Sequence, residues 1–128
     1  MSLRAPLARA LNHGAAHDGV SHWVVQRVTA LALAPLVVWL ICQLLWLPDA
    51  SYLTVTAWIA HSWNAVLLSL IVLLASWHAW LGVQMVVEDY VHAFLPKTGL
   101  LLLSAFVHAL LAASGVYAIL RIALRSAP

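Results

Sequence analysis

The chain is 128 residues long; 65% of its residues are hydrophobic, only 8% are charged, and its formal net charge is +2. Soluble domains carry about 25% charged residues, so this composition excludes a globular protein with a solvated surface. The few basic residues are scattered along the chain, which argues against a nucleic-acid partner. The length allows one domain, and the composition predicts an integral membrane protein embedded in lipid.

The first stretch, residues 1–22, is polar and rich in Ala, Gly and His, and we expect it to lie on the membrane surface or against a partner. It lacks the continuous apolar region of a cleavable signal peptide and does not resemble a transit peptide, which favours a bacterial membrane. Its histidines, His13, His17 and His22, are expected to be solvated or interfacial. No role is assigned to His22 from the sequence.

The rest of the chain, residues 23–128, is predicted to form one transmembrane domain. A spanning helix needs about 20 mostly apolar residues, and three segments qualify, at about 23–47, 57–87 and 99–124. Pro35 lies inside the first segment, where neighbouring groups can satisfy the freed carbonyl, so we expect a kink and not an end. Short connectors favour antiparallel neighbours. The fold class expected is all-α, with three transmembrane helices in an up-down-up bundle.

The distribution of basic residues predicts the orientation of this bundle. Four of them fall on the side of the N-terminus and the second connector: Arg4, Arg9, Arg27 and Lys97. Two, Arg121 and Arg125, fall on the opposite side. The positive-inside rule therefore places the N-terminus in the cytoplasm.

The second span carries a histidine, His78, about two-thirds of the way along an otherwise apolar helix. Ionisable residues inside a membrane are costly and often functional. Two interpretations stay open from the residues alone. His78 is either hydrogen-bonded to a neighbouring helix or an axial ligand of heme iron, for which neutral imidazole is common.

A stripe of residues extends from this histidine to the membrane edge. His78, Gly82, Met85 and Asp89 follow a helical spacing and share one face. Gly82 would let a flat porphyrin approach the backbone. Tyr90 follows Asp89, and a phenol beside a carboxylate suits the headgroup of a quinone, although an ordinary polar helix end fits the same residues.

Two more intramembrane residues call for partners. Arg27, near the start of the first span, either reaches lipid phosphates or pairs with an anionic group such as a heme propionate. His108 in the third span has Ser104 one turn away. A satisfied hydrogen bond is the expected state of His108, with a ligand role as the alternative.

Two stretches resemble a known family. HAWLGVQMVVEDYVH at residues 78–92 and GVSHWVVQRVTALALAPLVVWL at residues 19–40 resemble the first two helices of the small hydrophobic anchor subunit of succinate:ubiquinone oxidoreductase, succinate dehydrogenase. The three-span layout and the length agree with that family.

The resemblance implies roles for four residues. His78 matches an axial ligand of heme b, the other ligand coming from a second membrane-anchor cytochrome b subunit. Tyr90 matches the residue that hydrogen-bonds ubiquinone, Asp89 is its acidic neighbour, and Arg27 matches an arginine near the heme propionates. The other partners implied are an iron–sulfur subunit, a flavoprotein subunit and membrane lipid.

The function expected is that of a multi-pass anchor in a bacterial inner membrane, non-catalytic on its own, within an oxidoreductase. The chain has no dinucleotide fingerprint that could hold a flavin. One alternative is an anchor of fumarate reductase or another quinone-linked enzyme. Another, from a different class, is a heme-free proton-coupled transporter or assembly factor.

Overall fold

The computed structural model describes residues 14–125, with side chains described from residue 20 onward. Four helices make up this part of the chain: α2 (Gly14–Leu45), α3 (Tyr52–Ala60), α4 (Ser62–Tyr90) and α5 (Phe94–Arg125). The described residues contain no strand. Three stretches are long and apolar enough to cross a membrane: Val20–Leu45, Ser62–Tyr90 and Phe94–Arg125. The predicted all-α membrane fold is confirmed.

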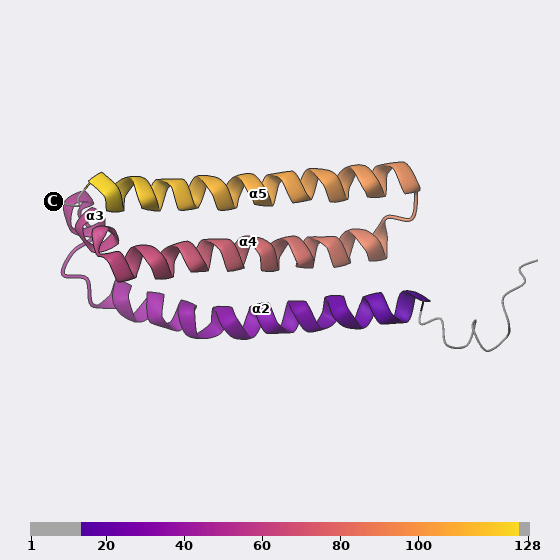
Figure 1. Ribbon diagram of the computed structural model, residues 1–128, viewed down its shortest axis with the longest axis horizontal. Helices are drawn as coiled ribbons and strands as arrows, with labels where there is room; N and C mark the ends of the chain where they lie inside the picture. The colour runs from indigo at the N-terminus through magenta and orange to yellow at the C-terminus, as the bar shows by residue number, and fades with distance from the viewer. Residues whose placement is uncertain (1–13, 126–128) are drawn as a thin grey trace, which may run out of the picture.

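The three long helices lie side by side and antiparallel, with α4 in the middle (Figure 1). α4 packs against α2 on one side and against α5 on the other, whereas α2 and α5 do not touch each other within the described residues. The bundle is therefore close to a single layer of helices. The up-down-up order expected from the short connectors is the order observed.

The first long helix continues through Pro35 without a break. Pro35 is exposed on the helix surface. α2 also begins at Gly14, so the helix extends N-terminal of the span predicted from residue 23. The last part of the polar N-terminal stretch is thus helical and continuous with the first span.

The second predicted span differs from the observed helices at its start. Residues 57–60 belong to the short helix α3, and the continuous helix begins only at Ser62. The Ser51 side chain accepts a hydrogen bond from the Thr54 N–H at 3.3 Å and so caps α3. His61 adopts an extended backbone conformation between the two helices. Apolar composition alone could not reveal this break, because helices rich in apolar residues lie on both sides of it.

The third span starts earlier than predicted, at Phe94. Pro96 lies in the first turn of α5, where backbone N–H groups have no helical partner, so proline costs nothing there. The connector between α4 and α5 shrinks to residues 91–93.

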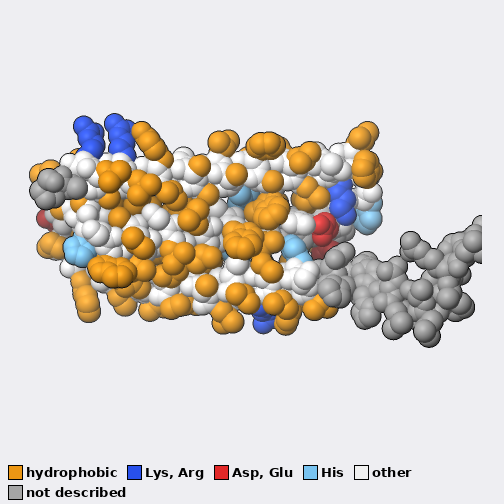
Figure 2. All heavy atoms as spheres, in the orientation of Figure 1, with side chains coloured by type: hydrophobic (Ala, Val, Ile, Leu, Met, Phe, Trp, Pro, Cys, Tyr) orange, Lys and Arg blue, Asp and Glu red, His pale blue; other side chains and the backbone are white. Residues whose placement is uncertain are grey.

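Very little of the described chain is buried. Ala65, Leu81 and Thr29 are its only buried residues. Large apolar side chains are exposed along all three spans, and charged side chains lie mainly towards the ends of the bundle (Figure 2). A layer without an interior core must cover its apolar faces with lipid or with other subunits. The chain is a multi-pass membrane protein.

Candidate functional site at the contact between the first and second spans

The contact between α2 and α4 is built around His78. Its Nδ1 lies 2.9 Å from the Thr29 Oγ1 on α2, a hydrogen bond between two different spans. Thr29 is 4% exposed and is the one buried polar residue of the described chain. The small threonine lets the helices approach closely while its hydroxyl meets the imidazole, which is a common way for membrane helices to associate.

The Thr29 hydroxyl also fixes which nitrogen of His78 carries the proton. Its Oγ1 lies 3.0 Å from the Gln26 carbonyl oxygen, which can only accept a hydrogen bond. The single hydroxyl proton is therefore directed to that carbonyl, and the Nδ1–H of His78 donates to Oγ1. We assign the tautomer from these two bonds. The lone pair of His78 is then on Nε2, the atom that a metal would bind.

Two further polar groups of α2 face the same contact. His22, Gln26 and Thr29 follow a helical spacing and form one stripe of α2. The His22 Nε2 and the Gln26 Oε1 are buried and have no hydrogen-bond partner within the described residues. Buried polar atoms without partners are rare, and they suggest a missing ligand or subunit. The helical spacing of the three residues was the available signal in the sequence, but no role was expected for any of them.

Gly82 lies opposite this stripe. A Cβ placed on Gly82 would lie 3.6 Å from the Gln26 Nε2, an ordinary van der Waals contact. The clearance expected above Gly82 is thus occupied by the Gln26 side chain here. A flat group could approach Gly82 only if that flexible side chain moved away.

A cavity of about 690 Å³ opens between α2 and α4 toward the Asp89 end of the bundle. Its size is within the range of small-molecule sites. Its apolar part includes Trp23, Val25, Trp77, Trp80 and Leu81, and its polar part is formed by Ser21, His22, Gln84, Glu88 and Asp89. Met85 also lines it, so the predicted stripe does bring Met85 and Asp89 to one wall. His78 itself lies outside the lining.

Tyr90 occupies a different position from its neighbour. It is the last residue of α4, is 79% exposed, and does not line this cavity. Two residues before Tyr90, the Glu88 Oε1 accepts a hydrogen bond from the Gln84 Nε2 at 3.0 Å. Asp89 and Tyr90 are both exposed at the end of α4, turned about 100° apart on the helix.

Arg27 lies on the outside of α2. Its guanidinium is 4.9 Å from the centroid of the Trp23 ring, a cation–π contact within one helix. Because Arg27 is two residues before Thr29, it is turned about 200° away from the contact with α4. The structure therefore does not bring Arg27 and His78 together inside this chain.

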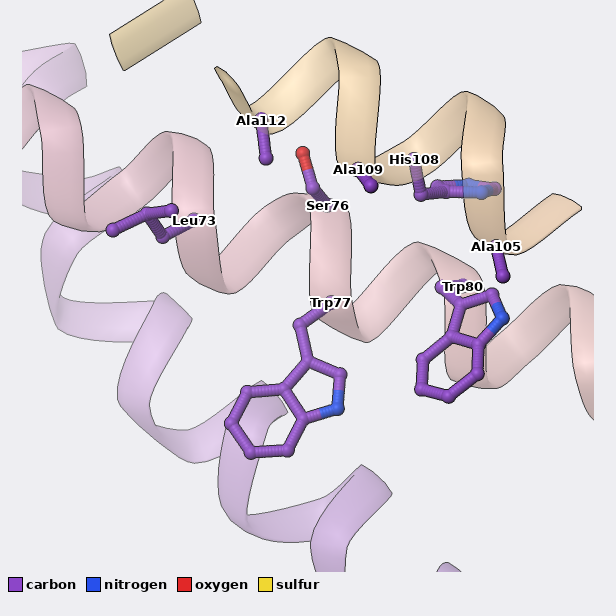
Figure 3. A pocket seen from close by; sticks show the side chains of 8 residues that line it. All are labelled: Leu73, Ser76, Trp77, Trp80, Ala105, His108, Ala109 and Ala112. Atoms are coloured by element: carbon purple, nitrogen blue, oxygen red, sulfur yellow. The ribbon is translucent and has the colours of Figure 1, made fainter.

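His108 belongs to a separate, mostly apolar cavity between α4 and α5 (Figure 3). This cavity has a volume of about 280 Å³ and is lined by Trp77, Trp80 and small side chains. The Nδ1 of His108 is 2.8 Å from the Ser104 carbonyl oxygen on its own helix. The hydrogen bond expected for His108 is present, within one helix and not between two.

The remaining histidines do not gather near His78. His61 separates α3 from α4, and His92 is exposed in the connector after α4. His13 lies outside the described residues, as does the side chain of His17. No group of three or more His, Cys, Asp or Glu side chains within the described residues could hold a metal ion. Any metal at His78 would therefore need ligands from elsewhere.

Comparison with known proteins decides the family. The model of the family described as "Succinate dehydrogenase/Fumarate reductase transmembrane subunit" matches residues 1–117 of this chain. The chain belongs to this family.

Its curated relatives include succinate dehydrogenase hydrophobic membrane anchor subunits. The one from Rickettsia conorii is 36% identical over 89 residues, which are 69% of this chain and 71% of the relative. The one from Rickettsia bellii is 33% identical over 88 residues, 69% of this chain and 70% of the relative. No solved structure shows significant similarity. The family and these relatives make the chain a membrane-anchor subunit of succinate dehydrogenase.

Proposed function

We propose that this anchor subunit binds heme b jointly with a second membrane-anchor cytochrome b subunit and contributes to the site where ubiquinone is reduced. The observation that carries the proposal is the Thr29–His78 hydrogen bond at 2.9 Å, which leaves the Nε2 of an intramembrane histidine free to bind iron. The family adds the expectation of a quinone-linked enzyme.

The residues around His78 fit a heme. The imidazole is held at Nδ1 by a buried hydroxyl, and metal-bound histidines usually have such a partner at their second nitrogen. The unpartnered His22 Nε2 and Gln26 Oε1 offer polar contacts nearby. Heme would supply a one-electron redox centre within the membrane. His78 would hold it from this side, with the second axial ligand from the partner anchor.

Arg27 fits this arrangement from the outer face of α2. A guanidinium there meets a carboxylate only if that carboxylate belongs to a group lying outside the three-helix layer. Heme propionates at the boundary with the partner anchor satisfy that condition. Arg27 would then bind them with charge-assisted hydrogen bonds.

The ubiquinone site is proposed at the end of α4. The Tyr90 hydroxyl donates a hydrogen bond to a quinone carbonyl, and the Asp89 carboxylate passes protons from the aqueous side. Tyr90 is exposed in this chain, which supports a site completed by another subunit. In such a complex the iron–sulfur subunit would supply the electrons, and the flavin of the flavoprotein subunit would oxidise succinate.

The proposed location is a bacterial inner membrane with the N-terminus in the cytoplasm. Asp89 and Tyr90 are the last two residues of α4. The end of α4 lies at the same end of the bundle as the start of α2 (Figure 1). The quinone site is therefore on the cytoplasmic side, next to the soluble subunits.

Heme content tests the proposal. In the complex purified with its partners, His78→Ala should lose the b-type absorption band, while oxidation of succinate with a soluble dye continues. His108→Ala is the matched control, because this intramembrane histidine is bonded within its own helix and should keep the band. An unchanged band in His78→Ala would rule out the ligand role.

A further inference from the structure

The opposite end of the bundle carries a cationic pocket that the proposed function does not use. It has a volume of about 480 Å³ and lies between α3 and the C-terminal end of α5. Figure 2 shows basic side chains gathered on the α5 side at this end. The lining residues are Tyr52 and Thr56 from α3, and Tyr117, Ala118, Arg121, Ile122 and Arg125 from α5.

Helical spacing aligns the polar groups of α5 in this pocket. Tyr117, Arg121 and Arg125 recur every fourth residue, so they form one stripe. Two guanidinium groups in such positions repel each other and weaken an isolated helix slightly. An anion between them converts that repulsion into two charge-assisted contacts.

No carboxylate of the described residues neutralises these two arginines. Asp49, in the connector at the same end, accepts a hydrogen bond from the Ser51 N–H at 2.9 Å. In the proposed orientation this end lies opposite the cytoplasm, where the positive-inside rule disfavours basic residues, so Arg121 and Arg125 go against the general trend. A bound anion would account for the position of these two arginines.

The hydrogen-bond donors of the pocket suit a phosphate group. Guanidinium forks bind phosphate oxygens in pairs, and the phenols of Tyr52 and Tyr117 each add an O–H donor. Thr56 is not available as a donor, because its hydroxyl is directed to the Tyr52 carbonyl oxygen at 2.7 Å. The donor set is therefore strictly cationic and phenolic.

The surroundings of the pocket favour a lipid over a free ion. Ala118 and Ile122 form an apolar wall, and Leu120 and Leu124 are exposed beside it on α5. The pocket lies at the end of helices long enough to span a membrane, which is where lipid headgroups would meet the chain. We propose that it binds the phosphodiester headgroup of an anionic phospholipid, with the acyl chains lying along α5.

The test measures lipid retention by the full chain, purified in mild detergent with the subunits that accompany it. Equal amounts of phosphatidylglycerol and phosphatidylcholine are added, and the retained lipids are counted by native mass spectrometry. Wild type should retain phosphatidylglycerol several-fold better than phosphatidylcholine. Arg121→Gln and Arg125→Gln should each reduce this preference, and the pair should abolish it. Lys97→Gln, the same charge change at the other end, should not alter it.

Three results would overturn the proposal. They are equal retention of the two lipids by wild type, unchanged preference in the double glutamine variant, and displacement of phosphatidylglycerol by millimolar inorganic phosphate, which would identify a site for free anions. If the double variant does not assemble, the retention of phosphatidylglycerol by Tyr117→Phe tests the proposal instead. It should lower retention several-fold, and full retention contradicts the proposal.

Discussion

Thr29 on the first span is hydrogen-bonded to His78 on the second span. Its hydroxyl links the Gln26 carbonyl to the His78 imidazole, so its loss leaves a partly buried nitrogen without this partner. Hydrogen bonds between membrane helices contribute about 0.6–2 kcal/mol. The larger consequence concerns His78, whose ring orientation and tautomer depend on this contact.

We predict that Thr29→Val lowers heme affinity about 10–100-fold, the usual effect of losing the partner of a ligating histidine. The heme reduction potential should shift as well, because the basicity of the ligand changes. Thr29→Ser, which keeps the hydroxyl, should restore both properties. A potential that is identical in all three proteins would show that Thr29 only packs the helices together.

A second residue-scale prediction concerns Tyr90. Tyr90→Phe removes the phenolic donor from an exposed position, so folding should be unaffected. Ubiquinone reduction by succinate should fall about tenfold or more, while reduction of a soluble dye persists. Tyr52→Phe, an exposed tyrosine at the other end, serves as the control. Equal loss with both acceptors would point to failed assembly instead of a quinone contact.

The candidate site was only partly predictable from these residues. The depth of His78 and the helical phase of Asp89 followed from the spacing and rise of an α-helix. The partner of His78 did not, because which residue of another span lies opposite depends on helix packing. Arg27 illustrates the same limit: its depth could be read from the sequence, but its outward direction follows from Thr29 facing α4.

At the scale of elements, α4 and α5 approach each other closely at Gly115. A Cβ there would lie 2.8 Å from the Val72 Cγ1, closer than real side chains approach each other. Valine is restricted in its rotamers, so the two helices would have to separate.

We therefore predict that Gly115→Ala destabilises the α4–α5 pair by about 1–3 kcal/mol, as overpacking does. Thermal unfolding of the purified complex measures it. Gly99→Ala is the matched control, because a Cβ at Gly99 meets nothing within 4 Å and alanine favours the helix. Equal unfolding temperatures for the two variants would contradict the packing seen here.

The short helix α3 gives a prediction that depends on pH. Hydrogen bonds from Ser51 and Thr54 lower the pKa of the Asp49 carboxyl below its ordinary value. A carboxyl with a lowered pKa stabilises the fold above its unfolded pKa of about 4, and this contribution is lost as the pH falls through the folded value. Amide exchange at the start of α3 should therefore accelerate in acid, relative to intrinsic rates. Asp49→Asn should remove this pH dependence; an unchanged profile would show that Asp49 does not stabilise α3.

The elements themselves were mostly predictable, since three long apolar segments with short connectors allow few alternatives. The short helix α3 was not, because its end at His61 depends on local backbone geometry within an apolar run. The early start of α5 was also missed, since a proline in the first turn of a helix looks like a breaker until the start of the helix is known.

At the scale of the whole molecule, the chain is a layer of three spans with little buried surface. Such a layer can present residues on both faces to other subunits, as an anchor requires. His78 with Thr29 occupies the contact of the first two spans, the Asp89 cavity opens at one end, and the cationic pocket lies at the other. The family places this layer within succinate dehydrogenase.

The proposed heme ligand is the Nε2 of His78. The most direct test of this role is ligand rescue: His78→Gly in the full complex leaves room for free imidazole at the position of the lost side chain. We predict that His78→Gly lacks the b-type absorption band and that added imidazole and heme restore it, whereas His108→Gly keeps the band without imidazole. A His78→Gly complex that shows the native band without imidazole would contradict the account.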